Sequence, residues 1–137
     1  MSFKADFKLD GGDGKPLRVF HCHYAFHQPI DSRGYPAGNV HAGTIDLEVE
    51  STEDLSLANW TLAPDMKKNG SITFYKRDGE QRMKEITFED AFMVNYAETF
   101  SNFGEHPMTE RVTLSAKKIS VQSGKGAAEH SNLWSDK

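Results

Sequence analysis

Residues 17–27, LRVFHCHYAFH, bring three histidines and the only cysteine of the chain close together in sequence. Imidazole nitrogens and thiolates are common ligands of zinc and other transition metals, and a cysteine activated by a histidine can act as a nucleophile. The run therefore raises two chemical hypotheses, a metal centre and a reactive thiol. Which of them is feasible depends on the secondary structure that positions these side chains.

Residues 17–28 alternate in the manner of a β-strand, whose successive side chains point to opposite faces. Cys22 then shares an apolar face with Phe20 and Tyr24, while His21 and His23 lie on the other face. The thiol cannot join these histidines on one metal ion, so we predict a buried, unreactive cysteine. Two histidines are fewer than the three protein ligands of most catalytic zinc sites. We therefore expect no metal, no other cofactor and no catalytic residue.

Composition and motifs narrow the classes of protein further. The sequence lacks the GxSxG, P-loop, dinucleotide-binding and HExxH patterns, which argues against the commonest enzymes that carry them. Its formal charge of -4 gives no indication of a nucleic-acid partner. No apolar run reaches the about 20 residues that cross a bilayer, and MSFKADFKLD has no apolar signal-peptide core. We expect synthesis in the cytoplasm, with no Sec signal and no membrane insertion.

A period of two in the apolar residues predicts a mostly β fold. The predicted strands are residues 3–9, 17–28, 44–50, 71–77, 83–101 and 109–122. Glu89 and Asp90 are expected to form a bulge or bend, because the apolar phase slips there. Residues 67–70, KKNG, are predicted to be a turn.

Residues 51–64 are the one segment with helical spacing of apolar residues. Ser51 or Thr52 offers an N-cap, two acidic residues follow in the first turn, and Pro64 ends the predicted helix. We predict one domain at 1–122, a β-barrel of two antiparallel-rich sheets with one α-helix packed on it. The Gly- and Ser-rich residues 123–137 are predicted to be a flexible C-terminal tail.

Several separate segments resemble one known family. They are GSITFYKRDGEQRMKEITFEDAFMVNYAETF, then PMTERVTLSAKKISV, and the earlier CHYAFHQPIDSRGYPAGNVHAGTIDLEVES. The last contains a Q-x-x-D-x-x-G-x-P loop formed by Gln28, Asp31, Gly34 and Pro36. Together they resemble the haemolysin-coregulated protein (Hcp, or TssD) family, the tube protein of type VI secretion systems, and in particular its Bacteroidota branch. The similarity covers about residues 1–122, although Tyr35 stands where a basic residue is expected.

This resemblance implies a structural protein rather than an enzyme. It implies homohexameric rings that stack into a tube inside a contractile sheath. The implied partners are further copies of the chain, the VgrG spike, the sheath and baseplate proteins, and effector cargo in the lumen. Contraction of the sheath would export the tube to the extracellular space without a signal peptide.

The resemblance also implies roles for three groups of residues. The residues of the long Pro/Gly-rich loop at 29–43 and of the motif before it are expected to reach the next ring: Gln28, Asp31, Ser32, Arg33, Gly34, Tyr35 and Pro36. The helix, with Leu55, Trp60 and Leu62, is expected to pack on the barrel and to line the lumen with its polar side. Strand faces that carry Lys8, Glu48 and Lys76 are expected at subunit contacts or in the lumen.

Two other classes stay open from the sequence. One is a monomeric barrel that binds a small ligand, which an apolar cavity and a monomeric mass would indicate. The other is a metal-dependent enzyme centred on His21 and His23, which a retained stoichiometric metal would indicate. The sequence also leaves open whether the chain is a main tube subunit or an accessory paralogue.

Overall fold

The computed structural model describes residues 4–10 and 15–134. In chain order its elements are β1 (Ala5–Leu9), β2 (Leu17–Tyr24), β3 (Thr44–Glu50), α1 (Ser56–Leu62), β4 (Lys68–Tyr75), β5 (Arg82–Phe100), β6 (Met108–Ser123) and β7 (Gly126–Ser131). The predicted mostly β fold with one helix is confirmed. The start of the first predicted strand, at residue 3, lies outside the described residues.

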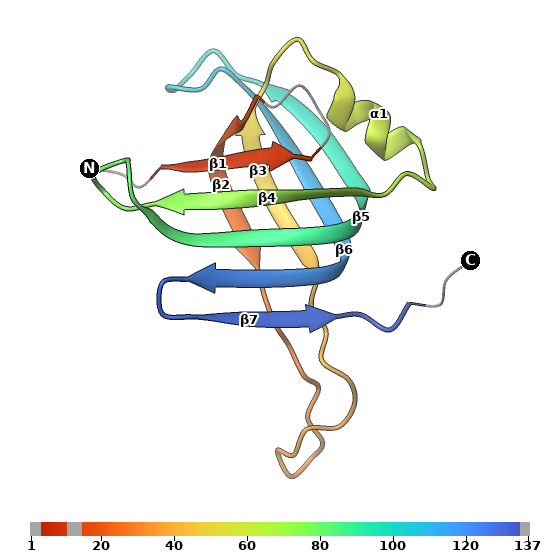
Figure 1. Cartoon of the computed structure of the whole chain (residues 1–137). Helices are drawn as coiled ribbons and strands as arrows, with labels where there is room; N and C mark the ends of the chain where they lie inside the picture. Colours follow the sequence, from red (N-terminus) through yellow and green to blue (C-terminus); the bar gives the residue numbers. More distant parts are fainter. Residues whose placement is uncertain (1–3, 11–14, 135–137) are drawn as a thin grey trace.

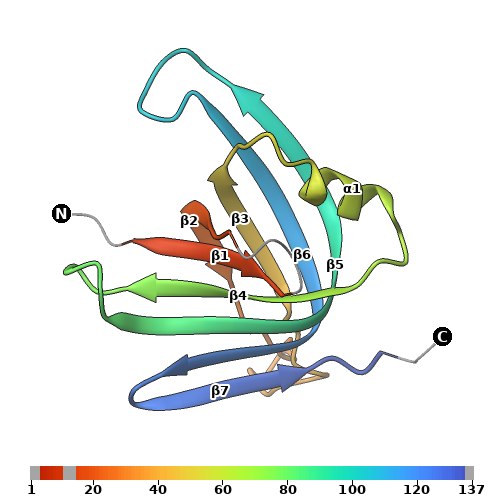
Figure 2. The same cartoon turned by 45° about the horizontal axis from the view of Figure 1, so that its top comes forward.

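Strands β1 to β6 close into an antiparallel barrel (Figure 1). The strand order is β3-β2-β1-β4-β5-β6-β7, and pairing of β3 with β6 completes the circle. These strands form one continuous sheet, which β5 and β6 bend into two crossing halves (Figure 2). Because β5 and β6 belong to both halves, the pairing of these two strands fixes how one half lies against the other.

The bend of β5 coincides with two irregularities in its pairing. One extra residue of β5 lies opposite β4 where Lys68 pairs with Ala91, and a second shift separates Met93 from Asn95 in the pairing with β6. Asp90 adopts a φ of 52°, and its N–H donates to the side chain of Asn69 at 2.8 Å. A bulge bends a strand and increases its twist. The bulge predicted at Glu89–Asp90 is therefore confirmed.

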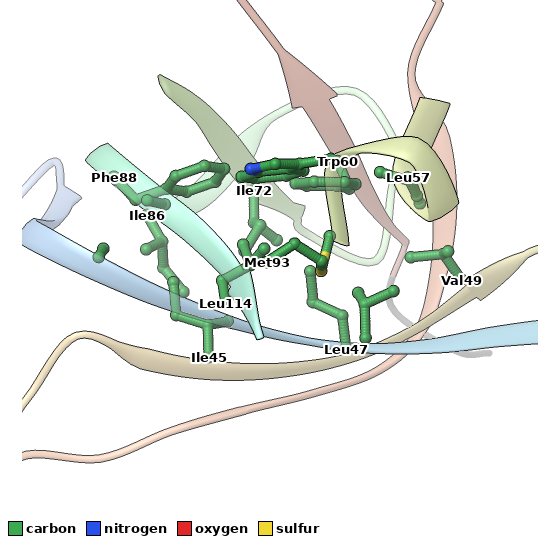
Figure 3. Packing of buried hydrophobic residues seen from close by; sticks show 14 of the residues in the cluster. Ile45, Leu47, Val49, Leu57, Trp60, Ile72, Ile86, Phe88, Met93 and Leu114 are labelled. Atoms are coloured by element: carbon green, nitrogen blue, oxygen red, sulfur yellow. The ribbon is translucent and has the colours of Figure 1, made fainter. Parts of the chain in front are cut away.

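The core lies between the two halves of the barrel and the inner face of α1. Trp60 and Leu57 of α1 lie over Ile72 and Met93, and Ile45 and other strand residues close the opposite side (Figure 3). The indole N–H of Trp60 donates to the carbonyl of Met66 at 2.9 Å, so the polar atom of this buried ring is satisfied. The short helix thus covers one opening of the barrel.

The helix is shorter than predicted. It begins at Ser56 with Leu55 as the N-cap, so the predicted capping by Ser51 or Thr52 is wrong. The carboxylate of Asp54 accepts hydrogen bonds from the N–H and hydroxyl of Ser56 at 3.0 and 3.1 Å. Such a local side-chain bond competes with helix formation and holds residues 51–55 in an irregular connection. The turn predicted at 67–70 is also wrong, because β4 begins at Lys68.

The flexible tail predicted from residue 123 is wrong for residues 126–131, which form β7. This strand pairs with Lys118–Ser123 of β6 after a tight turn. Most of its side chains are exposed, so backbone pairing rather than a buried apolar face forms it. Residues 135–137 of the predicted tail lie outside the described residues. Within the described ranges, no helix is long and apolar enough to cross a membrane.

Candidate assembly surfaces

Residues 25–43, the extended loop, project from the end of the barrel between β2 and β3 (Figure 1). His27 and His41 exchange two backbone hydrogen bonds of 2.9 and 2.6 Å across the loop. A second isolated bridge joins Ile30 to Pro36 near the tip. The two arms of the loop are therefore held side by side, although they lack a continuous strand pair.

The tip of the extended loop is organised by the side chain of Asp31. Its carboxylate accepts the N–H groups of Arg33 and Tyr35 at 2.9 and 3.1 Å, and these bonds hold the pKa of Asp31 below its ordinary value. Gly34 has a φ of +86°, which favours glycine. Arg33 pairs with Asp31 at 3.4 Å and lies over the ring of Tyr35 at 5.0 Å. Asp31 and Gly34 of the motif Q-x-x-D-x-x-G-x-P therefore hold the loop tip in its observed shape.

The seven residues predicted for ring stacking all lie in this loop: Gln28, Asp31, Ser32, Arg33, Gly34, Tyr35 and Pro36. The structure brings Asp31, Arg33 and Tyr35 into one contact group. It places Gln28 on the arm below the bridge between Ile30 and Pro36.

The base of the extended loop is anchored by Asn132, a residue that sequence reasoning missed. Its side-chain amide donates to the carbonyls of Ala42 and Ala116 at 2.8 and 3.0 Å. Gly43 lies between them with a φ of +98°, and a Cβ there would be 2.5 Å from the Ala116 oxygen. No local pattern could identify Asn132, because its partners lie 90 and 16 residues away in the sequence.

Residues 100–108, the hairpin tip, join β5 to β6 at the other end of the barrel (Figure 1). Phe100 and Phe103 are 68% and 84% exposed, and Met108 is also exposed. The ring of His106 stacks on Phe20 of β2, with 3.8 Å between the ring centroids. Two phenylalanines in a segment rich in polar, Gly and Pro residues were the sequence signal for this surface, and sequence reasoning did not use it.

The histidine and cysteine run has the alternation predicted at its centre. Cys22 packs against the core, and burial, with a smaller contribution from the charge of Asp46, raises its pKa to about 11. His21 and His23 are exposed on the opposite face. Phe20, predicted beside Cys22, instead stacks on the hairpin tip, because a bulge between residues 19 and 21 shifts the phase. Among the described residues, no three His, Cys, Asp or Glu side chains are arranged to hold a metal.

The three helix residues predicted to pack on the barrel differ in burial. Trp60 is buried, but Leu55 and Leu62 are 64% and 80% exposed and do not pack on the barrel. The reason is that the helix begins at Ser56, which places its buried face on Leu57 and Trp60.

The three charged residues predicted on strand faces also have different positions. Lys8 is exposed on β1, and Glu48 of β3 accepts a 3.0 Å hydrogen bond from Arg111. Lys76 follows the end of β4, so it lies in the turn before β5 rather than on a strand face. The structure does not bring these three residues into one surface.

One buried acidic group lies near the hairpin tip. Glu110 of β6 is 3% exposed and lies opposite Glu98 of β5. Burial is the main cause that raises the pKa of Glu110, and Glu98 adds to it, whereas bonds from Tyr96 and from Thr52 oppose the rise. Burial together with Glu110 raises the pKa of Tyr96 to about 12. Through its bonds with Tyr96 and Thr52, Glu110 connects β5 and β6 to the segment that follows β3. These contacts indicate a structural role for Glu110.

The comparisons with known proteins identify the family. The family model described as Hemolysin coregulated protein Hcp (TssD) matches residues 1–135. The chain belongs to the Hcp (TssD) family. The solved structure of Hcp1 from Flavobacterium johnsoniae is 35% identical, with a TM-score of 0.83, over 94% of this chain and 99% of that chain. Hcp1 from Salmonella typhimurium has the same fold at 17% identity, with a TM-score of 0.75, over 94% of this chain and 93% of that chain.

Membership of the Hcp family and the Bacteroidota-like resemblance are thus confirmed. Hcp proteins are secreted structural tube proteins of type VI secretion systems and associate with themselves; the family is not a known class of enzymes. The family match continues through β7, past the domain boundary predicted at residue 122. The comparison with curated proteins found no match.

Proposed function

We propose that this Hcp-family chain is the subunit of the inner tube of a type VI secretion system. Copies of the chain form hexameric rings, and the rings stack into a tube that sheath contraction exports. The observation that carries the proposal is the likeness to Hcp1 of Flavobacterium johnsoniae over nearly the whole of both chains. The exposed apolar residues at both ends of the barrel support a role in assembly.

In this proposal the extended loop makes the contact between rings. Asp31 and Gly34 hold its tip in one shape before any partner binds. A surface that is ordered in advance loses less conformational entropy on association than a mobile loop does. The projection of the loop from one end of the barrel, beyond the closed strands, also supports this role (Figure 1).

The further partners in this proposal are the VgrG spike, the sheath and baseplate proteins, and effector cargo in the lumen. The carrier role is supported by a solved structure of the same fold, which is described as a type VI secretion system effector from Yersinia pestis and is 12% identical. The polar outer side of α1 and the strand faces with Lys8 and Glu48 are proposed to serve the lumen or the contacts within a ring.

The native mass of the full chain at micromolar to millimolar concentration tests the ring. We expect a species of six times the 15.4 kDa chain mass and open rings in negative-stain electron microscopy. A protein that stays monomeric at every concentration, without rings, would contradict the proposal.

A charge reversal in the loop separates ring closure from stacking. Asp31→Lys is expected to leave rings intact and to prevent tubes, because it removes the acceptor that shapes the loop tip. Asp78→Lys is the matched control, since Asp78 accepts two backbone N–H groups in the same way in the turn between β4 and β5. Tubes of normal length from the Asp31 variant would exclude the loop as the stacking element.

A further inference from the structure

His27 and His41 lie directly opposite each other on the two arms of the extended loop. They exchange two backbone hydrogen bonds, of 2.9 and 2.6 Å, in an antiparallel bridge. Residues paired in this way point their side chains to the same face, with their Cβ atoms about 5 Å apart. Both side chains are exposed, so small ions can reach the two rings. His41 lies outside the run at 17–27, so that run alone gave no indication of this pair.

The two rings of this pair are close enough to share one ion. Their centroids are 6.3 Å apart, and their planes differ by 25°. An imidazole nitrogen binds zinc at about 2.0–2.1 Å, which places the centroid of the ring about 3.2 Å from the ion. Two rings that bind the same ion are therefore at most about 6.4 Å apart. Rotation of these two exposed side chains can bring one nitrogen of each ring to a shared ion.

The backbone holds the histidine pair in place before any ion binds. On the side of the loop tip, the N–H of Ala37 donates to the carbonyl of Pro29 at 2.8 Å. On the side of the barrel, the side-chain amide of Asn132 donates to the carbonyl of Ala42 at 2.8 Å. The two arms are therefore tied together above and below the pair. Ligands that are held side by side in advance lose little conformational entropy when they bind an ion.

A hollow beside His41 leaves room for water ligands of the ion. It has a volume of about 290 Å³, and its lining includes His23, Asp46 and Asn132 as well as His41. The negative charge of Asp46 favours a cation in this part of the surface. Within the part of the chain that the structure describes, no three His, Cys, Asp or Glu side chains are arranged around one ion. Water therefore completes the coordination of an ion bound to the pair.

We propose that His27 and His41 form a binding site for a divalent transition metal ion such as Zn²⁺, and that the ion joins the two arms of the extended loop. Imidazole is a ligand that zinc, copper and nickel prefer, whereas magnesium and calcium prefer oxygen ligands. Two protein ligands hold an ion less tightly than four, so binding is reversible and depends on the free metal concentration. This inference goes beyond the proposed tube function and does not depend on it, because both ligands belong to one chain.

Calorimetric titration of the purified full-length chain with zinc chloride tests the site. We expect a single ion per chain, and a large excess of Mg²⁺ should not compete with it. His27→Ala and His41→Ala should each weaken zinc binding by at least about tenfold, because loss of a group that only supports a ligand already costs about 10–100-fold. His21→Ala is the matched control and should bind zinc with unchanged affinity, since His21 is also exposed but lies on β2 opposite Glu48.

His23→Ala separates the pair from the histidine next to it. His23 lines the hollow but is not part of the bridge, so this variant should change zinc affinity far less than His41→Ala does. Zinc binding that survives in both His27→Ala and His41→Ala would indicate an adventitious ion only and would overturn the proposal. Binding that is lost in His23→Ala and kept in His27→Ala would overturn the assignment of the two ligands.

Amide hydrogen exchange gives a second readout within the loop. When free Zn²⁺ is about 100 times its Kd, the population of any open state that lacks the site should fall about 100-fold. The bridge amides of His27 and His41 should therefore exchange more slowly with zinc, and EDTA should reverse the change. Exchange in the hairpin tip is the internal control and should not respond. Zinc binding that leaves exchange at the bridge unchanged would show that the ion does not join the two arms.

Discussion

The extended loop and the hairpin tip project from opposite ends of one barrel, but they are ordered by different means. The hairpin tip continues the pair of β5 and β6, whose register is regular from Asn95 opposite Thr113 to Phe100 opposite Met108. The extended loop has only two isolated bridges, and its shape depends on Asp31 at the tip and Asn132 at the base. Strand pairing spreads its stabilisation over many backbone groups, whereas the loop concentrates it on single side chains. Single substitutions should therefore damage the loop more than the hairpin tip.

Gly43→Ala is expected to produce the largest effect. The left-handed φ costs about 1–2 kcal/mol for a residue with a Cβ, and the clash with the Ala116 oxygen adds to it. We expect a loss of about 3 kcal/mol or more in the free energy of unfolding, measured by urea denaturation at neutral pH. Gly34→Ala is the control, since it has a similar φ but nothing within 4 Å. Equal losses in the two variants would show that the close approach at the base does not matter.

Asn132→Ala is expected to have the next largest effect. It removes two donors from the carbonyls of Ala42 and Ala116 and should cost about 1–3 kcal/mol. Amide hydrogen exchange of the extended loop should become faster, while exchange in the hairpin tip should not change. Asn59→Ala, on the exposed side of α1, is the control. Unchanged exchange at residues 41–44 would mean that the loop base is held without this side chain.

Phe20→Ala tests the other region. It removes the ring on which His106 stacks, a contact worth about 1 kcal/mol. We expect faster amide exchange at residues 101–107 only, because strand pairing still holds the ends of the hairpin tip. NMR detection of the His106 ring resonances gives a direct check. Faster exchange throughout β5 and β6 would contradict the contrast between the two regions.

The pH dependence of the loop tip is expected to be the smallest effect. The amides of Arg33 and Tyr35 hold the pKa of Asp31 below its ordinary value of 3.8. Ionised Asp31 therefore stabilises the loop above pH 3.8, and this contribution is lost as the pH falls through the lowered pKa. The Tyr35 amide resonance should report the loss. In Asp31→Asn the side-chain oxygen can still accept, so the same resonance should be nearly independent of pH; a titration that persisted there would assign the change to another group.

Local patterns were sufficient to predict much of the barrel. Alternation identified the strands around Phe7, Leu47 and Leu114, all of which are buried. A slip in that alternation located the bulge at Asp90, because an extra residue must turn the following side chains to the other face. The same rule separated Cys22 from His21 and His23. The same rule assigned Phe20 to the wrong face, because β2 has a bulge between residues 19 and 21 that the sequence pattern does not indicate.

The sequence by itself thus determined the six barrel strands and the one helix segment, because each follows from the pattern of neighbours along the chain. Only the tertiary structure decided that residues 126–131 form a strand, since exposed side chains carry no periodic signal and β6 supplies the template. It also decided that Asn132 supports a loop base 90 residues earlier. The placement of the extended loop and the hairpin tip at opposite ends of the barrel has the same origin (Figure 1). The pairing of β3 with β6 closes the barrel and brings together residues that are far apart in the sequence. This closure fixes where the two ends of the barrel lie.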